Sequence, residues 1–128
     1  MGLADEQAAL VAALVAGGEL PAGFDAARVG IARDALLRKR AGEVAAAWPL
    51  LAAHLGTQWT VVFAGWARNR PPGGALRDGW DLARALAAAG RLPTGAAGEL
   101  RARERRWRYD GVRPPRRRTL GAILHSGR

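Results

Sequence analysis

Proline and glycine breaks, which divide the chain into short segments with helical periodicity, constrain its fold most. Pro49 disfavours a helical conformation at Trp48, and Pro71-Pro72 cannot continue a helix because proline lacks an amide hydrogen. Between the breaks, apolar residues recur three and four positions apart, which is typical of helices with one buried face. The pattern predicts six helices, over residues 3–16, 26–47, 49–55, 57–70, 78–89 and 95–107.

The predicted fold is therefore mainly α, a small bundle of five to six helices that occupies residues 1–98. A chain of 128 residues makes one modest domain, and its many alanines leave only a thin core. Large aromatic rings supply the buried area that alanine lacks. Four tryptophans lie on or beside predicted apolar faces and are interpreted as core residues: Trp48, Trp59, Trp66 and Trp80.

Polar residues predict where several helices begin and which faces they expose. Asp25 is a good N-cap for the second helix, and Thr57 and Thr94 are candidate caps for later ones. Asp78 and Asp81 near the start of the fifth helix are better explained by capping than by catalysis. The charged residues of the second helix are expected mostly on its outer face: Arg33, Asp34, Arg38, Lys39 and Arg40.

Arginine is concentrated near the C-terminus, in a basic extension assigned to residues 99–128. Residues 101–118 hold nine arginines against Glu104 and Asp110, whereas the rest of the chain is close to neutral. Segments 105–109 and 119–125 can each be a strand, and the Asp110-Gly111 pair favours a turn between them. A short β-hairpin and a disordered tail are both compatible with this pattern. Trp107, which arginines flank on both sides, either packs on the bundle or stacks against an arginine or a ligand.

Residues that could carry out catalysis or hold a cofactor are missing from the sequence. The chain has no cysteine, and neither His54 nor His125 has a second ligand three or four residues away. No glycine pattern matches a nucleotide-binding loop. The first residues lack the features of a signal peptide, and no apolar run reaches the length of a membrane span. We therefore expect a non-enzymatic cytoplasmic protein with no membrane contact, no catalytic residue, no metal site and no cofactor of its own.

An ordered set of features between residues 24 and 100 resembles a known protein family. A long helix ends in Trp48-Pro49, a short helix ends in Leu55-Gly56, and an aromatic-rich helix leads to Pro71-Pro72 and a last helix. This order resembles the helical domain of the bufferin-cluster partner proteins, the BufC/HvfC-like family, long labelled a DNA-binding domain. It resembles still more a short actinobacterial relative of that family, which is found alone or fused behind an enzyme.

The resemblance implies a non-catalytic accessory subunit. Members of the family pair with multinuclear non-haem iron oxidative enzymes that modify ribosomally made peptides, and they are thought to present the leader part of the precursor peptide. The iron would belong to the partner enzyme in such a heterodimer, and an extended peptide could add to the edge of a strand pair.

Three interpretations of the basic extension follow. In the first, arginines and aromatic rings bind a partner protein or peptide. In the second, they bind nucleic acid through its phosphates and bases. In the third, the extension is solvated and binds nothing. The first is preferred, and its predicted partner- or peptide-binding residues are Arg105, Arg106, Trp107, Arg108, Tyr109, Arg116, Arg117 and Arg118.

Overall fold

The computed structural model describes residues 25–119, so the predicted helix over 3–16, His125 and most of the predicted strand over 119–125 lie outside it. The described part is mainly helical, as predicted, and it ends in a small antiparallel sheet whose second strand lies at Arg116–Arg117, ahead of the predicted strand over 119–125. Its elements are α2 (Ala26–Ala47), α3 (Pro49–Leu55), the 3₁₀ turn η1 (Gly56–Gln58), α4 (Trp59–Ala67), α5 (Ala75–Ala88), α6 (Thr94–Arg106), β1 (Trp107–Arg108) and β2 (Arg116–Arg117).

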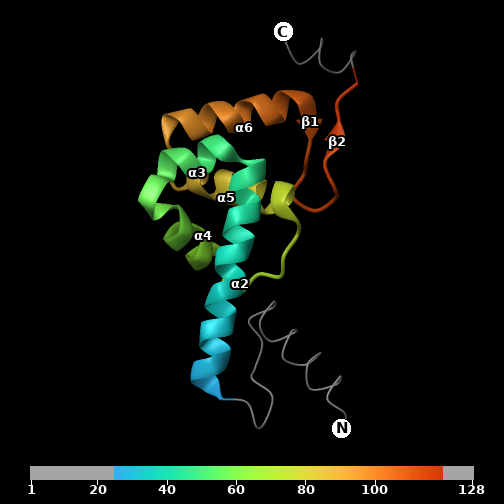
Figure 1. Ribbon diagram of the computed structural model, residues 1–128. Helices are drawn as coiled ribbons and strands as arrows, with labels where there is room; N and C mark the ends of the chain where they lie inside the picture. Colours follow the sequence, from blue (N-terminus) through green and yellow to red (C-terminus); the bar gives the residue numbers. More distant parts are fainter. Residues whose placement is uncertain (1–24, 120–128) are drawn as a thin grey trace.

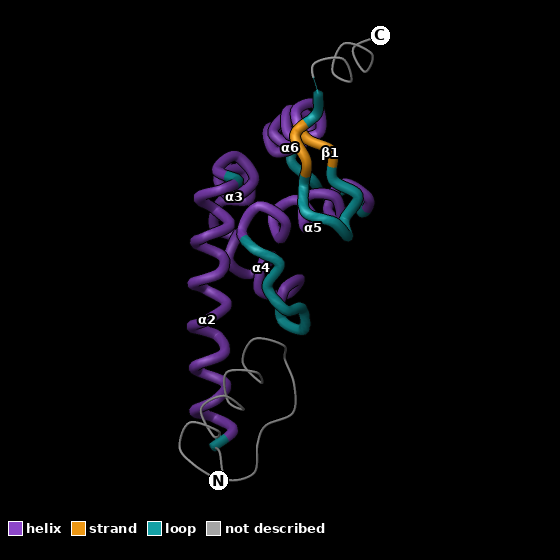
Figure 2. Tube along the Cα trace, turned by 90° about the vertical axis from the view of Figure 1, so that its right-hand side faces the viewer, coloured by secondary structure: helices purple, strands orange, loops and turns teal. Residues whose placement is uncertain are grey.

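Helix α2 forms the long axis of the bundle and packs against α3, α4 and α5 (Figure 1). Helix α6 lies across one end, over α3 and α5, and continues directly into the hairpin of β1 and β2. In both views the first half of α2 extends beyond the other described helices (Figure 2). The boundary predicted between residues 98 and 99 falls inside α6.

The bounds of α2 follow the sequence signals. Asp25 caps its start as predicted, because its Oδ1 accepts hydrogen bonds from the amides of Ala27, at 2.9 Å, and Arg28, at 3.4 Å. The helix ends at Ala47, and Trp48 turns the chain before Pro49 begins α3. The outer-face assignment of Arg40 is wrong, since this side chain is buried. Its guanidinium donates to the carbonyl of Arg70, at 3.1 Å, and to Asp78 Oδ2, at 3.4 Å.

Three predicted helix starts are also wrong. Thr57 lies in the 3₁₀ turn, and α4 begins two residues later at Trp59 without a side-chain cap. Helix α5 begins at Ala75, so Asp78 lies inside the helix, where its Oδ1 accepts from the amide of Gly73 at 3.0 Å. Thr94 is the first residue of α6 rather than its cap. In each case the predicted residue lies one or more positions away from the observed N-cap, which is Gln58, Gly74 or Pro93.

Helix α3 is capped from another helix rather than by its own sequence. The carboxylate of Glu99 on α6 accepts hydrogen bonds from the amides of Leu50, at 3.0 Å, and Leu51, at 2.8 Å. These amides have no partner within a helix, so an acceptor placed there satisfies them. Glu99 therefore joins α6 to the start of α3.

Aromatic rings fill the core, as the tryptophan pattern predicted. Trp48 and Trp80 are fully buried and meet edge to face, with ring centres 5.7 Å apart. Trp59 is buried beside Phe63, at 5.5 Å, and Trp66 is half-buried against the same cluster. The largest fully buried side chains are Trp48, Trp80, Phe63, Leu51, Leu82 and Val44.

Candidate functional site

The hairpin displays the C-terminal arginines on a defined backbone. Trp107 pairs with Arg117 and Arg108 with Arg116, and Gly111 has a φ of 86° in the connecting loop, a conformation that favours glycine. Of the eight predicted residues, five are exposed: Arg105, Arg106, Arg108, Arg116 and Arg117. Trp107 and Arg118 are half-buried, and Tyr109 is buried. The structure thus divides the predicted set into outward-facing cations and side chains that attach the hairpin to the bundle.

Tyr109 is a core residue rather than part of the exposed surface. Its ring lies 4.9 Å from that of Trp80, and its hydroxyl donates to Asp81 Oδ1 at 2.8 Å. Desolvation by burial, together with the carboxylate of Asp81, raises the pKa of Tyr109. Arg84 on α5 also donates to the Tyr109 carbonyl, at 2.6 Å. The sequence analysis placed Tyr109 among the binding residues, but this side chain, which follows β1, lies in the core.

Glu104 holds the end of α6 and the hairpin on α5. Its carboxylate accepts two hydrogen bonds from Arg84, at 2.9 and 3.0 Å, and one from the indole nitrogen of Trp80, at 3.1 Å. Its main-chain carbonyl accepts from Arg118 Nε at 2.9 Å. Partial burial raises the pKa of Glu104, but the hydrogen bonds and positive charge outweigh it, so the net pKa lies below its ordinary value.

Two more arginines of the cluster serve the fold. Arg103 donates to the carbonyl of Ala47 at the end of α2, and its guanidinium lies 4.6 Å from the centre of the Trp48 ring. Arg117 lies over the half-buried ring of Trp107, at 5.8 Å. A nearby carbonyl or aromatic face stabilises the cation in both places. The sequence showed how many arginines lie between residues 101 and 118, but it could not show which of them have partners within the chain.

We define the basic surface as the exposed arginines of α6 and the hairpin: Arg101, Arg105, Arg106, Arg108, Arg113, Arg116 and Arg117. Within residues 25–119, Arg101, Arg105, Arg106, Arg108 and Arg116 make no side-chain hydrogen bond or ion pair. Asp110 is the exposed acid among them, and its Oδ1 accepts from the amides of Val112, at 2.9 Å, and Arg113, at 2.8 Å. These backbone bonds lower the pKa of Asp110. Its carboxylate therefore stabilises the turn.

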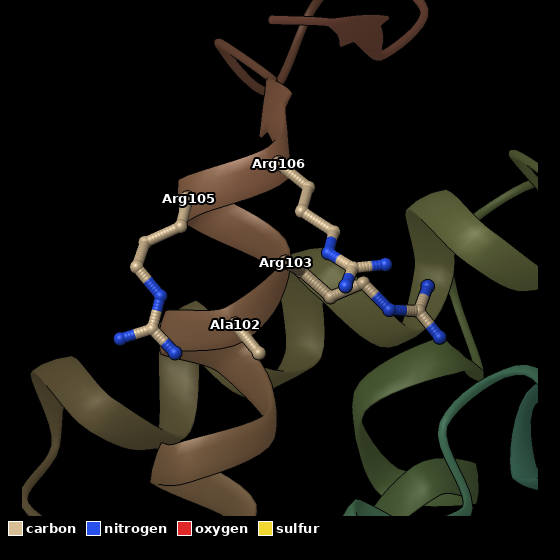
Figure 3. A pocket seen from close by; sticks show the side chains of 4 residues that line it. All are labelled: Ala102, Arg103, Arg105 and Arg106. Atoms are coloured by element: carbon tan, nitrogen blue, oxygen red, sulfur yellow. The ribbon is translucent and has the colours of Figure 1, made fainter. Parts of the chain in front are cut away.

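Shallow hollows lie along the basic surface. One of them, about 490 Å³ in volume, is lined by Ala102, Arg103, Arg105 and Arg106. Figure 3 shows Ala102 at its centre, with Arg105 on one side and Arg103 and Arg106 on the other. Two smaller hollows, about 230 and 160 Å³, lie on the hairpin, and both are lined by Arg108 and Arg116. Guanidinium groups spaced in this way suit carboxylate or phosphate oxygens.

A separate hollow, which sequence analysis missed, lies between α2 and α4. It has a volume of about 360 Å³ and contains the exposed side chain of Val61. Its other lining residues are Asp34, Leu37, Arg38, Thr60, Ala64, Gly65 and Arg68. An exposed valine at an outward-facing helix position was the sequence signal for it.

Ligands suited to a metal ion do not gather in the part of the chain that the structure describes. No three histidine, aspartate or glutamate side chains of residues 25–119 come together there. His54, at the exposed end of α3, lies against Gly95 of α6. Across the same residues, every helix is too short or too polar to cross a membrane.

Comparison with known proteins shows the family. The model of the SCO6045-like C-terminal domain matches residues 4–88. The chain belongs to this family. It is also 39% identical, over 127 residues, to a UPF0276 protein of Streptomyces avermitilis, a match that covers 98% of this chain and 26% of the relative. This chain thus spans about a quarter of the relative's length. No solved structure matches.

Proposed function

We propose that this SCO6045-like domain is a non-catalytic partner that binds a multinuclear non-haem iron oxidative enzyme and helps to present a ribosomal precursor peptide to it. The observation that carries the proposal is the basic surface, on which five arginines without a partner in the described chain extend from a well-packed frame. Arginine is enriched at protein interfaces and often forms their hot spots. The iron is supplied by the enzyme.

The comparisons support a domain that works beside another protein unit. The matched family is described as a C-terminal domain, and about three quarters of the Streptomyces relative lies outside the match. A domain joined to a larger protein in one organism can act as a separate subunit in another. The BufC/HvfC-like resemblance supplies the identity of the proposed enzyme and belongs to the same proposal.

The outer edge of β2 offers a place for an extended peptide. The amide of Arg118 donates to the carbonyl of Arg106 at 2.8 Å, so Arg106 and Arg118 form a hydrogen-bonded pair. Hydrogen-bonded and non-hydrogen-bonded pairs alternate along antiparallel strands, so the next pair, Trp107 and Arg117, is not hydrogen-bonded. The main-chain N–H and C=O of Arg117 consequently point away from β1. A peptide strand can pair with such an edge.

Co-purification tests the proposal. The tagged chain is co-expressed with the iron enzyme encoded nearest to it and analysed by size exclusion in about 0.3 M salt, which screens loose electrostatic contacts. We expect a stoichiometric complex that the double variant Arg105→Glu/Arg108→Glu weakens. The control Arg28→Glu/Lys39→Glu reverses two exposed charges on α2 and should leave the complex intact. A lone monomer for the unaltered chain would contradict the proposal.

Nucleic-acid binding is the second candidate, and the arginines of the basic surface favour it. Contact with five phosphates would give a slope of log affinity against log salt of about −4.5 on duplex DNA. Base stacking receives less support, because Tyr109 is buried and Trp107 lies beneath Arg117. A DNA titration across salt concentrations that gave this slope, together with no enzyme complex, would favour the second candidate over the first.

A further inference from the structure

The hairpin register places two unpaired arginines directly opposite each other. Arg108 on β1 faces Arg116 on β2, and both are exposed. Directly opposite residues of an antiparallel pair extend to the same face of the sheet, with Cβ atoms about 4.5–5.5 Å apart. Arg117, the next residue, lies on the other face over Trp107. The two guanidinium groups therefore share one side of the hairpin.

This arrangement is unfavourable in isolation, because like charges directly opposite in a sheet repel. No carboxylate within residues 25–119 pairs with either guanidinium. Asp110 lies nearby, in the wall of the 160 Å³ hollow, but it accepts from two amides of the turn. The repulsion is relieved if an external anion binds between the two side chains.

The backbone that carries this pair is held firmly on the bundle. Tyr109, the residue after Arg108, is buried and bonded to Asp81. Arg77 donates to the carbonyl of Val112 at 2.9 Å, and Arg118 donates to that of Glu104. A ligand thus meets guanidinium groups whose backbone is already ordered, which reduces the entropy lost on binding.

We propose that Arg108 and Arg116 form a clamp for one carboxylate of an acidic peptide. Both arginines line both hairpin hollows, so either hollow can hold an anion beside the pair. Arginine binds carboxylate through two parallel hydrogen bonds. The open edge of β2 favours a peptide over nucleic acid, because it can hold an extended main chain while the clamp binds a side chain. This inference rests on the proposed function for its choice of a peptide.

Peptide binding by the full chain tests the clamp. The probe is a short fluorescent peptide of alternating valine and glutamate, compared with the same peptide carrying glutamine. We expect the chain to prefer the glutamate peptide, and we expect Arg108→Gln/Arg116→Gln to weaken its binding about tenfold, which corresponds to about 1.4 kcal/mol. The control Arg28→Gln/Arg91→Gln removes two exposed charges outside the basic surface and should change affinity less than threefold.

Equal weakening by the two double variants would overturn the clamp, because affinity would then follow total charge alone. So would tighter binding of a short DNA duplex that only the hairpin variant loses, since the ligand would then be a phosphate. Thermal unfolding shows whether the hairpin variant is folded. Because Arg108→Gln/Arg116→Gln removes the repulsion between two cations, its melting temperature should be no lower than that of the unaltered chain. If the enzyme complex forms but the chain does not prefer the glutamate peptide, the clamp is rejected and the proposed function is not. If the chain prefers the glutamate peptide but forms no enzyme complex, the proposed enzyme partner is rejected and the clamp is not.

Discussion

Trp48 packs directly on the backbone of Gly79. A Cβ atom at Gly79 would lie 2.2 Å from Trp48 Cδ1 and 2.5 Å from its Nε1, closer than atoms can approach. The indole cannot move aside, because it is fully buried and its N–H donates to the carbonyl of Leu76 at 2.9 Å. This contact lets α5 approach the residue that ends α2.

Replacing Gly79 with alanine should therefore destabilise the domain although it improves helix propensity. Overpacking typically costs about 1–3 kcal/mol, and the propensity gain of about 1 kcal/mol offsets only part of it. We expect a lower free energy of unfolding in urea. Gly42→Ala is the matched control, because it too is helical but a Cβ there meets nothing within 4 Å. If both variants are equally stable, the contact does not constrain the fold.

Removing the Tyr109 hydroxyl should loosen the hairpin without changing its charge. Tyr109→Phe deletes the 2.8 Å hydrogen bond to Asp81, which is worth about 1 kcal/mol. The free energy of unfolding should fall by about that amount. A double-mutant cycle with Asp81→Ala isolates the pair, and we expect the second change to cost little once the first is present. Additive losses would show that the hydroxyl acts through other groups.

Acid should weaken the attachment of α6 and the hairpin through Glu104. The folded pKa of Glu104 is lowered, so its contribution to stability is fully present above the ordinary glutamate pKa of about 4.3 and is lost as the pH falls through the lower folded value. Unfolding free energies measured from pH 7 down to about pH 3 should therefore show this loss only below about pH 4.3. In Glu104→Gln this part of the decline should disappear, and an unchanged pH profile would contradict the assignment.

Arg40 and Asp78 should behave as a unit because both are buried. Arg40→Met leaves the Asp78 carboxylate without its cation and should cost about 3 kcal/mol. Adding Asp78→Asn removes that charge and keeps an oxygen for the amide of Gly73, so the double variant should recover much of the loss. Arg38→Met, at an exposed position of the same helix, is the control, with an expected change within about 0.5 kcal/mol.

The sequence was sufficient where a local signal decides the structure. Asp25 caps α2 through its own side chain, and Pro49 ends that helix whatever surrounds it. The burial of Trp48 and Trp80 followed from the spacing of apolar residues. Gly111 with its positive φ likewise follows from the Asp110-Gly111 turn signal.

Partners distant in the sequence were not predictable. Helical spacing cannot show that Arg40 meets Asp78, thirty-eight residues away, and so it placed the arginine outside. Glu99 caps a helix that begins fifty residues earlier, a contact that depends on how α6 crosses α3. For the candidate site, the sequence located the arginine cluster, but its division into partnered and unpartnered side chains depends on tertiary contacts with α2 and α5.

The end of α6 and the hairpin also determine where this domain can be cut for separate expression. The family match ends at residue 88, the last residue of α5. A fragment ending there would lose Glu104, the hydrogen-bond acceptor of the buried Trp80 indole, and Tyr109, whose ring packs against it. Deletion boundaries and fusion joints chosen from the aligned region alone would thus divide one packed unit. A fragment that keeps these contacts and the hydrogen bond from Arg118 to the Glu104 carbonyl extends through at least Arg118.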